Sequence, residues 1–146
     1  MEHKTLEQLE ALASLHAEMP DRMTRLDRLD RWASVLEREP RRRLRMLVGT
    51  EYQAPGLRDR LQCSGSPLAV AFEDPVLRAA GLRGDSYGAA REFFELSHRE
   101  LHRIVCYCHN GLAAEAQTVA ARVRALARRH AHAGVVARAC SFITGR

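Results

Sequence analysis

A chain of 146 residues with 46% hydrophobic side chains is long enough to bury the core of one domain, and no run approaches the roughly 20 apolar residues of a membrane span. The net charge of +5 comes almost entirely from arginine, which fits an acidic partner and equally the arginine enrichment of a GC-rich genome. The four cysteines are too few and too irregularly spaced to predict a disulfide scaffold. The N-terminus lacks the basic segment followed by an apolar run that is typical of a signal peptide. We therefore expect a cytoplasmic protein with reduced thiols.

Helices are predicted from the beginning of the chain. A capping-box pattern and apolar residues at helical spacing predict a first helix over about residues 5–19, and Pro20 ends it. A second amphipathic helix is expected over about residues 22–38. Pro40 then predicts the start of a short helix, because proline is favoured at the first helical position.

The middle of the chain is less regular. Residues 48–67 contain prolines and glycines and are interpreted as a connection between two parts of the protein. Residues 68–72 are the only segment that competes as a strand, but the segment is short and alone, and a strand needs partners. Pro75 predicts another helix start, and Gly81 is expected to end that helix.

Three or more helices are predicted after this point. Asp85 is a candidate N-cap for a helix near residues 86–95. A second capping box opens a helix near residues 98–110, and a long helix is expected at about residues 112–132. Gly134 is expected to separate a final short helix.

These elements predict an all-α fold. We expect one domain, a helical bundle of about eight helices. An N-terminal helical hairpin would occupy residues 1–48, and the main bundle would occupy residues 67–146.

Side chains that bind metals are concentrated in the predicted helix near residues 98–110. They are His98, His102, Cys106, Cys108 and His109. Imidazole and thiolate are ligands that zinc, copper and iron sites use. We therefore interpret this segment as a candidate site for zinc or another transition metal.

A regular helix would not let all five residues bind one ion. His98 and His109 would lie about 16 Å apart along the axis, and Cys106 and Cys108 would point roughly 160° apart unless the helix unwinds. The helix offers a metal two ligands at i and i+4, either His98 with His102 or His102 with Cys106. Further ligands must come from elsewhere, and the candidates are Cys63, His16, His130, His132 and Glu95.

The segment of residues 89–104 looks like a helix-turn-helix, whose second helix would direct polar side chains to DNA bases. It departs from that pattern at two positions. Glu95 stands where the turn usually has glycine, and Arg91 stands where a small packed residue is usual and a buried arginine would be costly.

The C-terminal part of the chain is strongly basic, because six arginines and no acidic residue follow Glu115. If the protein binds nucleic acid, this end of the chain is where we expect the contact. The candidate nucleic-acid-binding residues are Arg99, Arg103, Arg122, Arg124, Arg128 and Arg129.

The sequence favours a small, cytosolic, non-enzymatic regulatory or interaction protein with a His/Cys metal site. A nucleic-acid-binding protein with a degenerate helix-turn-helix is the alternative. A thiol-dependent enzyme or redox sensor that uses Cys106 with His102 is the second alternative. A protein partner or self-association would use an exposed apolar patch around Leu26, Leu29 and Trp32, and no membrane contact is expected.

Overall fold

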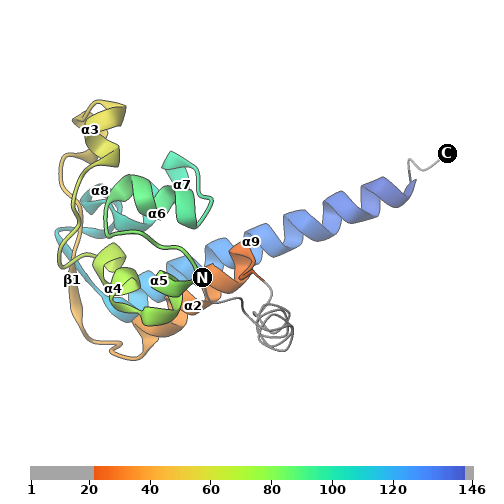
Figure 1. Ribbon diagram of the computed structural model, residues 1–146, viewed down its shortest axis with the longest axis horizontal. Helices are drawn as coiled ribbons and strands as arrows, with labels where there is room; N and C mark the ends of the chain where they lie inside the picture. The colour runs from red at the N-terminus through yellow and green to blue at the C-terminus, as the bar shows by residue number, and fades with distance from the viewer. Residues whose placement is uncertain (1–21, 144–146) are drawn as a thin grey trace, which may run out of the picture.

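The computed structural model describes residues 22–143, with side chains as far as residue 138. The longest element is α9 (Ala116–Ile143), which begins in the body of the protein and projects from it at its C-terminal end (Figure 1). The predicted helix over residues 5–19 lies outside the described residues, so the N-terminal hairpin stays a prediction.

Helix α2 (Arg25–Glu37) packs along α9 and makes the most extensive helix–helix interface among the described elements. It begins at a capping box in which Thr24 and Asp27 exchange hydrogen bonds. This cap explains why the helix starts at Arg25 and not, as predicted, at about residue 22. The ring of Trp32 stacks on that of Phe94 with centroids 4.6 Å apart. Leu29 and Trp32 are completely buried, so the prediction of an exposed patch at these residues is wrong.

Six short helices lie between the 3-10 helix η1 (Thr50–Tyr52) and α9. They are α3 (Pro55–Asp59), α4 (Pro67–Glu73), α5 (Pro75–Ala79), α6 (Tyr87–Phe93), α7 (His98–Val105) and α8 (Tyr107–Asn110). Side chains of Ser66, Asp74, Ser86 and Ser97 accept backbone hydrogen bonds in the first turns of α4, α5, α6 and α7. The competing strand over residues 68–72 is therefore helical, and Ser86 caps α6 in place of Asp85.

Two segments that were expected to be helical form a small antiparallel sheet. Strand β1 (Arg43–Arg45) pairs with β2 (Ala113–Glu115), and Leu44 lies opposite Ala114. As a consequence, no helix starts at Pro40, and α9 begins at Ala116 instead of near residue 112. The described chain is mostly helical, as predicted, but the all-α class overlooked this sheet.

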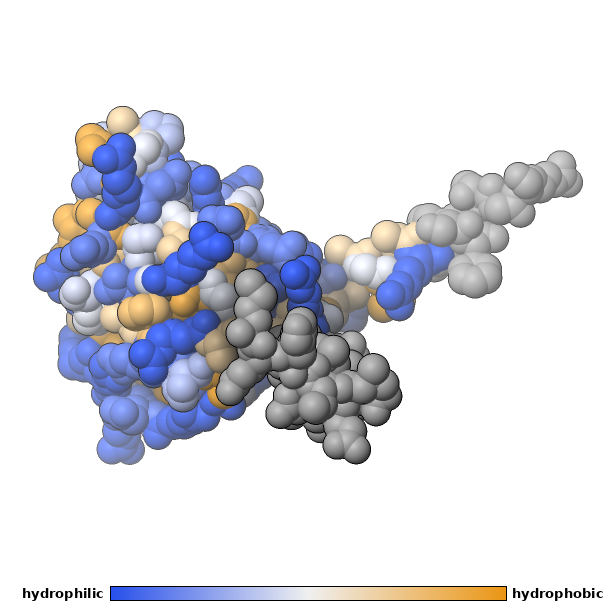
Figure 2. All heavy atoms as spheres, in the orientation of Figure 1, coloured by the Kyte–Doolittle hydropathy of each residue, from blue (hydrophilic) through white to orange (hydrophobic). Residues whose placement is uncertain are grey.

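Helix α9 continues through Gly134, so the predicted final short helix is not a separate element. A glycine inside a helix costs about 1 kcal/mol relative to alanine, and the alanine-rich sequence around it compensates for that cost. Beyond the body, α9 exposes Val135 and Val136, and Figure 2 shows paler apolar side chains along the projecting part. None of the described helices is both long and apolar enough to cross a bilayer.

Candidate metal centre

The helix predicted over residues 98–110 is interrupted at Cys106, which separates α7 from α8 and has an extended backbone with ψ of 143°. A parallel bridge to a distant segment produces the break. The N–H of Leu47 donates to the carbonyl of Val105 at 2.8 Å, and the N–H of Tyr107 donates to the carbonyl of Leu47 at 2.9 Å. This is the unwinding that both cysteines need in order to face the same ion.

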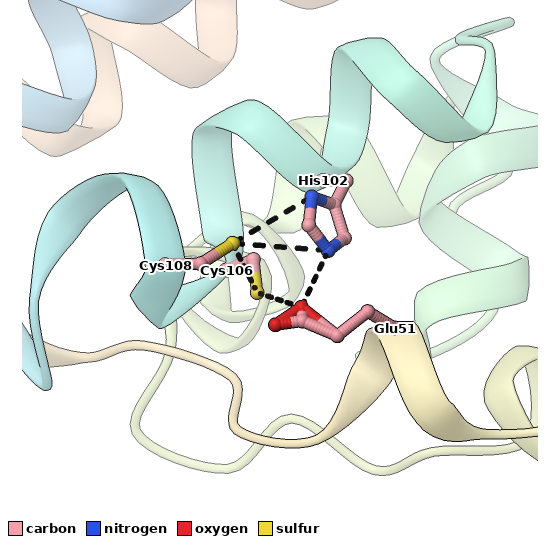
Figure 3. Close-up of side chains that lie close together, drawn as sticks. All are labelled: Glu51, His102, Cys106 and Cys108. Atoms are coloured by element: carbon pink, nitrogen blue, oxygen red, sulfur yellow. Dashed lines mark hydrogen bonds and ion pairs between the residues drawn. The ribbon is translucent and has the colours of Figure 1, made fainter.

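Four potential ligands meet at the break, namely Glu51, His102, Cys106 and Cys108, and their side chains point toward one another (Figure 3). One ligand atom from each lies within 4.8 Å of the other three. The two sulfur atoms are 3.2 Å apart, and Nε2 of His102 is 3.4 Å from Oε2 of Glu51. In a tetrahedral zinc site, neighbouring ligand atoms lie about 3.3–3.8 Å apart, as bond lengths of about 2.0–2.3 Å require. Small side-chain movements would therefore bring this set to zinc-binding distances.

The fourth side chain, Glu51, comes from the irregular connection and was missed by the sequence analysis. It lies in the 3-10 helix η1 (Thr50–Tyr52), which follows a left-handed turn at Gly49. The hydroxyl of Thr50 is buried and donates to Sγ of Cys106 at 3.4 Å, while Arg58 donates to the carbonyl of Thr50 at 2.9 Å. A lone acid in an irregular segment carries no spacing signal, so only the tertiary contact identifies it.

Two of the five predicted ligands, His98 and His109, lie beside the cluster. Nε2 of His109 is 3.2 Å from Nδ1 of His102, so His109 can orient His102 while the opposite ring nitrogen faces Glu51. Nδ1 of His98 is 2.7 Å from the hydroxyl of Tyr87. The structure therefore gathers three of the predicted residues in the cluster and leaves the other two outside it.

The other suggested ligands are engaged elsewhere in the fold. Cys63 donates to the carbonyl of Leu61, and burial raises the pKa of its thiol to about 12. His130 pairs with Glu100, Glu95 pairs with Arg28, and His132 lines a groove beside α9. His16 lies outside the described part of the chain.

The surroundings of Cys108 and of the two neighbouring histidines, His98 and His109, favour the neutral forms of these side chains. Loss of solvent, followed by the nearby cation of Arg58, lowers the pKa of His98, and loss of solvent followed by His102 lowers the pKa of His109. Partial desolvation and the hydrogen bond to Cys106 raise the pKa of Cys108 to about 11. A metal that binds Cys108 at neutral pH must therefore displace its proton.

The predicted nucleic-acid-binding arginines divide into two groups. Arg124 makes two hydrogen bonds of 2.7 Å with Glu37 and faces α2. The other five lie around a groove between α7 and α9, and they are Arg99, Arg103, Arg122, Arg128 and Arg129.

Comparisons of the chain with protein-family models, with curated proteins and with solved structures found no match.

Proposed function

We propose that this protein is a metal-responsive regulatory protein that binds one transition-metal ion through Glu51, His102, Cys106 and Cys108. The observation that carries the proposal is the approach of these four ligand atoms to within 4.8 Å of one another. Two sulfurs and one imidazole fit zinc and disfavour magnesium and calcium, which take oxygen ligands. Zinc is the metal that we expect.

A regulatory role is favoured over a purely structural one by the position of the cluster. The hydrophobic core includes residues of α2, α4, α6, α7 and α9, and Cys106 is buried beside it, whereas Cys108 at the outer side of the cluster is exposed. Structural zinc sites commonly have only cysteine and histidine ligands. The carboxylate of Glu51, which comes from a different segment of the chain, is therefore the ligand that we expect to leave the metal and to be replaced by water. Binding would tie η1 to the α7–α8 junction, and release would free that contact while the core stays intact.

A dithiol redox sensor is the second candidate, and the 3.2 Å approach of Cys106 to Cys108 supports it. A histidine-activated nucleophile has less support. The sulfur of Cys106 contacts Thr50, Glu51 and Cys108. The cysteine whose sulfur lies 3.9 Å from Nδ1 of His102 is instead Cys108. The raised pKa of Cys108 leaves little thiolate at neutral pH.

Zinc affinity tests the proposal directly. The metal-free full chain would be titrated with zinc against a chromophoric chelator, and cobalt would be substituted to detect thiolate-to-metal absorption. We expect a stoichiometry of one, and we expect Cys106→Ser and His102→Ala each to weaken binding by more than about tenfold. Cys63→Ser is the matched control, because this cysteine lies outside the cluster, and it should bind zinc like the wild type.

Two results would overturn the metal proposal. One is the failure of the folded wild type to bind zinc at concentrations of about 10 µM, because a site with two thiolates should have a dissociation constant well below this concentration. The other is an equal loss of affinity in Cys63→Ser and Cys106→Ser, which would place the ion elsewhere.

A further inference from the structure

Two adjoining hollows between α7 and the middle of α9 share Glu100, Arg103 and Arg129 and together form a groove lined by basic side chains. Arg99 and Arg103 line it from α7. The α9 side contributes Arg122, Arg128, Arg129 and His132. The two helices thus bring together cations that are distant in the sequence.

Four of these arginines carry a charge that no described residue neutralises. The side chains of Arg99, Arg103, Arg128 and Arg129 are exposed, and within the described residues their guanidinium groups form no ion pair or hydrogen bond. The acidic residue at the groove is Glu100, and its Oε1 lies 2.9 Å from Nε2 of His130. The groove therefore keeps a net positive charge that an anionic ligand can neutralise.

Arg122 is held in a fixed position at the edge of the same groove. It donates to the backbone carbonyl of Arg103 at 3.2 Å and to that of His109 at 3.0 Å. Because α9 is fastened to both α7 and α8 in this way, the two walls of the groove keep a defined separation. A rigid spacing of cations is what recognition of a regular anionic polymer requires.

The connection between α6 and α7 has the compact turn of a helix-turn-helix. Glu95 adopts a left-handed conformation with φ of 52°, the conformation that glycine usually supplies at this point. The N–H of Leu96 donates to the carbonyl of Arg91 at 3.0 Å, and the N–H of Glu95 donates to the carbonyl of Glu92 at 3.2 Å. These two bonds form a Schellman motif, so the glutamate takes the place of the glycine without a change of geometry.

The second departure from the helix-turn-helix pattern is also accommodated. Arg91 is not buried, because its side chain is 39% exposed and pairs with Asp59 at 3.4 Å. Phe94, Leu96 and Leu101 are buried where α6 and α7 meet. α7 contacts α6 through the hydroxyl of Tyr87, which lies 2.7 Å from Nδ1 of His98, and the exposed side of α7 offers Arg99 and Arg103.

The form of the groove favours a duplex over a single strand. The residues that line it include no Phe, Tyr or Trp, whereas proteins that bind single strands commonly stack bases on such rings. A helix fits the major groove of B-form DNA, while the major groove of duplex RNA is too narrow for side-chain readout. We propose that the surface formed by α7 and α9 binds the phosphate backbone of duplex DNA.

The expected strength follows from the number of free cations. Neutralisation of about four phosphates would give a plot of log K against log salt concentration with a slope of about −3.6. Contacts limited to phosphates correspond to dissociation constants of about 1–100 µM at physiological salt. His102 faces the metal cluster, so little sequence preference is expected from α7.

Fluorescence anisotropy on the full chain tests this proposal. The probes are a labelled 24-base-pair DNA duplex, one of its single strands and the RNA duplex of the same sequence, each at several salt concentrations. We expect the DNA duplex to bind most tightly. The double variant Arg103→Ala with Arg129→Ala should reduce the affinity for this duplex at least tenfold and should reduce the magnitude of the salt slope by about 2. The control is Arg41→Ala with Arg83→Ala, which removes the same charge from exposed arginines outside the groove.

Several outcomes would overturn it. An equal loss of affinity in the control variant would mean that net charge, not the groove, attracts the DNA. Tighter binding of the single strand or of the RNA duplex would assign the groove to that ligand instead. Failure of the folded wild type to bind the DNA duplex at about 50 mM salt would remove the proposal altogether. Circular dichroism would verify that each variant is folded.

Discussion

Sγ of Cys106 and Sγ of Cys108 lie 3.2 Å apart because the chain leaves the helical conformation at Cys106. On an unbroken helix these two side chains would point to nearly opposite sides. Cys106 is buried beneath Thr50, while Cys108 is exposed, so a dissolved oxidant reaches the pair through Cys108.

We expect hydrogen peroxide to convert this pair into a disulfide in the metal-free protein. The two thiols lose two electrons and two protons, and each peroxide molecule is reduced to two molecules of water. Bound zinc should slow the reaction, because it occupies both sulfurs. Mass spectrometry of the tryptic peptide over residues 104–122 would detect the loss of two hydrogens. Cys63→Ser should behave like the wild type, and faster oxidation of Cys63 than of Cys108 would contradict the prediction.

The number of protons that zinc binding releases at neutral pH should include one from the thiol of Cys108. The raised pKa of Cys108, about 11, means that this thiol is protonated below that pH, so zinc affinity should rise with pH across the neutral range. Calorimetric titrations in buffers of different ionisation enthalpy measure the number directly. Cys108→Ser should release about one proton fewer than the wild type, and an unchanged number in this variant would show that Cys108 is not a ligand.

Asp74 should stabilise the fold at neutral pH and lose that effect in acid. Its buried carboxylate accepts two hydrogen bonds from Arg31, at 2.8 and 3.0 Å, and one from the N–H of Leu77. Arg31 is the largest cause of its lowered pKa. Because the folded-state pKa lies below the unfolded one, the stabilisation is complete above about pH 4 and disappears as the pH falls through the folded-state value.

Asp74→Ala should therefore lower the free energy of unfolding by about 2–3 kcal/mol at pH 7, through loss of the ion pair and of the α5 cap. Urea unfolding at several pH values measures this, and the difference from the wild type should shrink in acid. Asp85→Ala is the comparison, and a change within about 0.5 kcal/mol is expected for it. A pH-independent difference for Asp74→Ala would show that the carboxylate charge is not the cause.

Glu95→Gly should stabilise the protein by about 1 kcal/mol, because glycine adopts the left-handed conformation of this residue without steric cost. The ion pair with Arg28 that is lost is weak, with a separation of 3.5 Å and a Glu95 side chain that is 60% exposed. Glu95→Ala removes the same ion pair but keeps the strain. Thermal unfolding of the two variants would separate the effects, and equal stability of both would refute the backbone explanation.

Gly88→Ala should destabilise the protein by about 2 kcal/mol, because a Cβ at this position would lie 2.7 Å from the carbonyl oxygen of Asp59. The clash would push α3 away from α6, and Arg58 of α3 would carry the displacement to Thr50 beside the metal cluster. Zinc affinity should therefore fall as well. Gly84→Ala meets no atom within 4 Å and serves as the control, for which neither stability nor affinity should change.

The sequence by itself determined several helices whose start signals are local. The capping box of Ser97 and Glu100, the start of α5 at Pro75 and the turn at Gly81 appear where they were expected, because each depends on residues within one or two helical turns. The concentration of histidine and cysteine between residues 98 and 109 was likewise visible without a structure. Local chemistry was enough to find the segment that supplies three members of the cluster.

Only the tertiary structure decided how these side chains are arranged. The bridge from Leu47 breaks the helix at Cys106, and the pairing of β1 with β2 moves the start of α9. Glu51 reaches the cluster from an irregular segment about fifty residues away. Each of these features depends on hydrogen bonds or contacts between parts of the chain that are far apart in sequence. Periodicity describes one element at a time, and it therefore carries no information about such contacts.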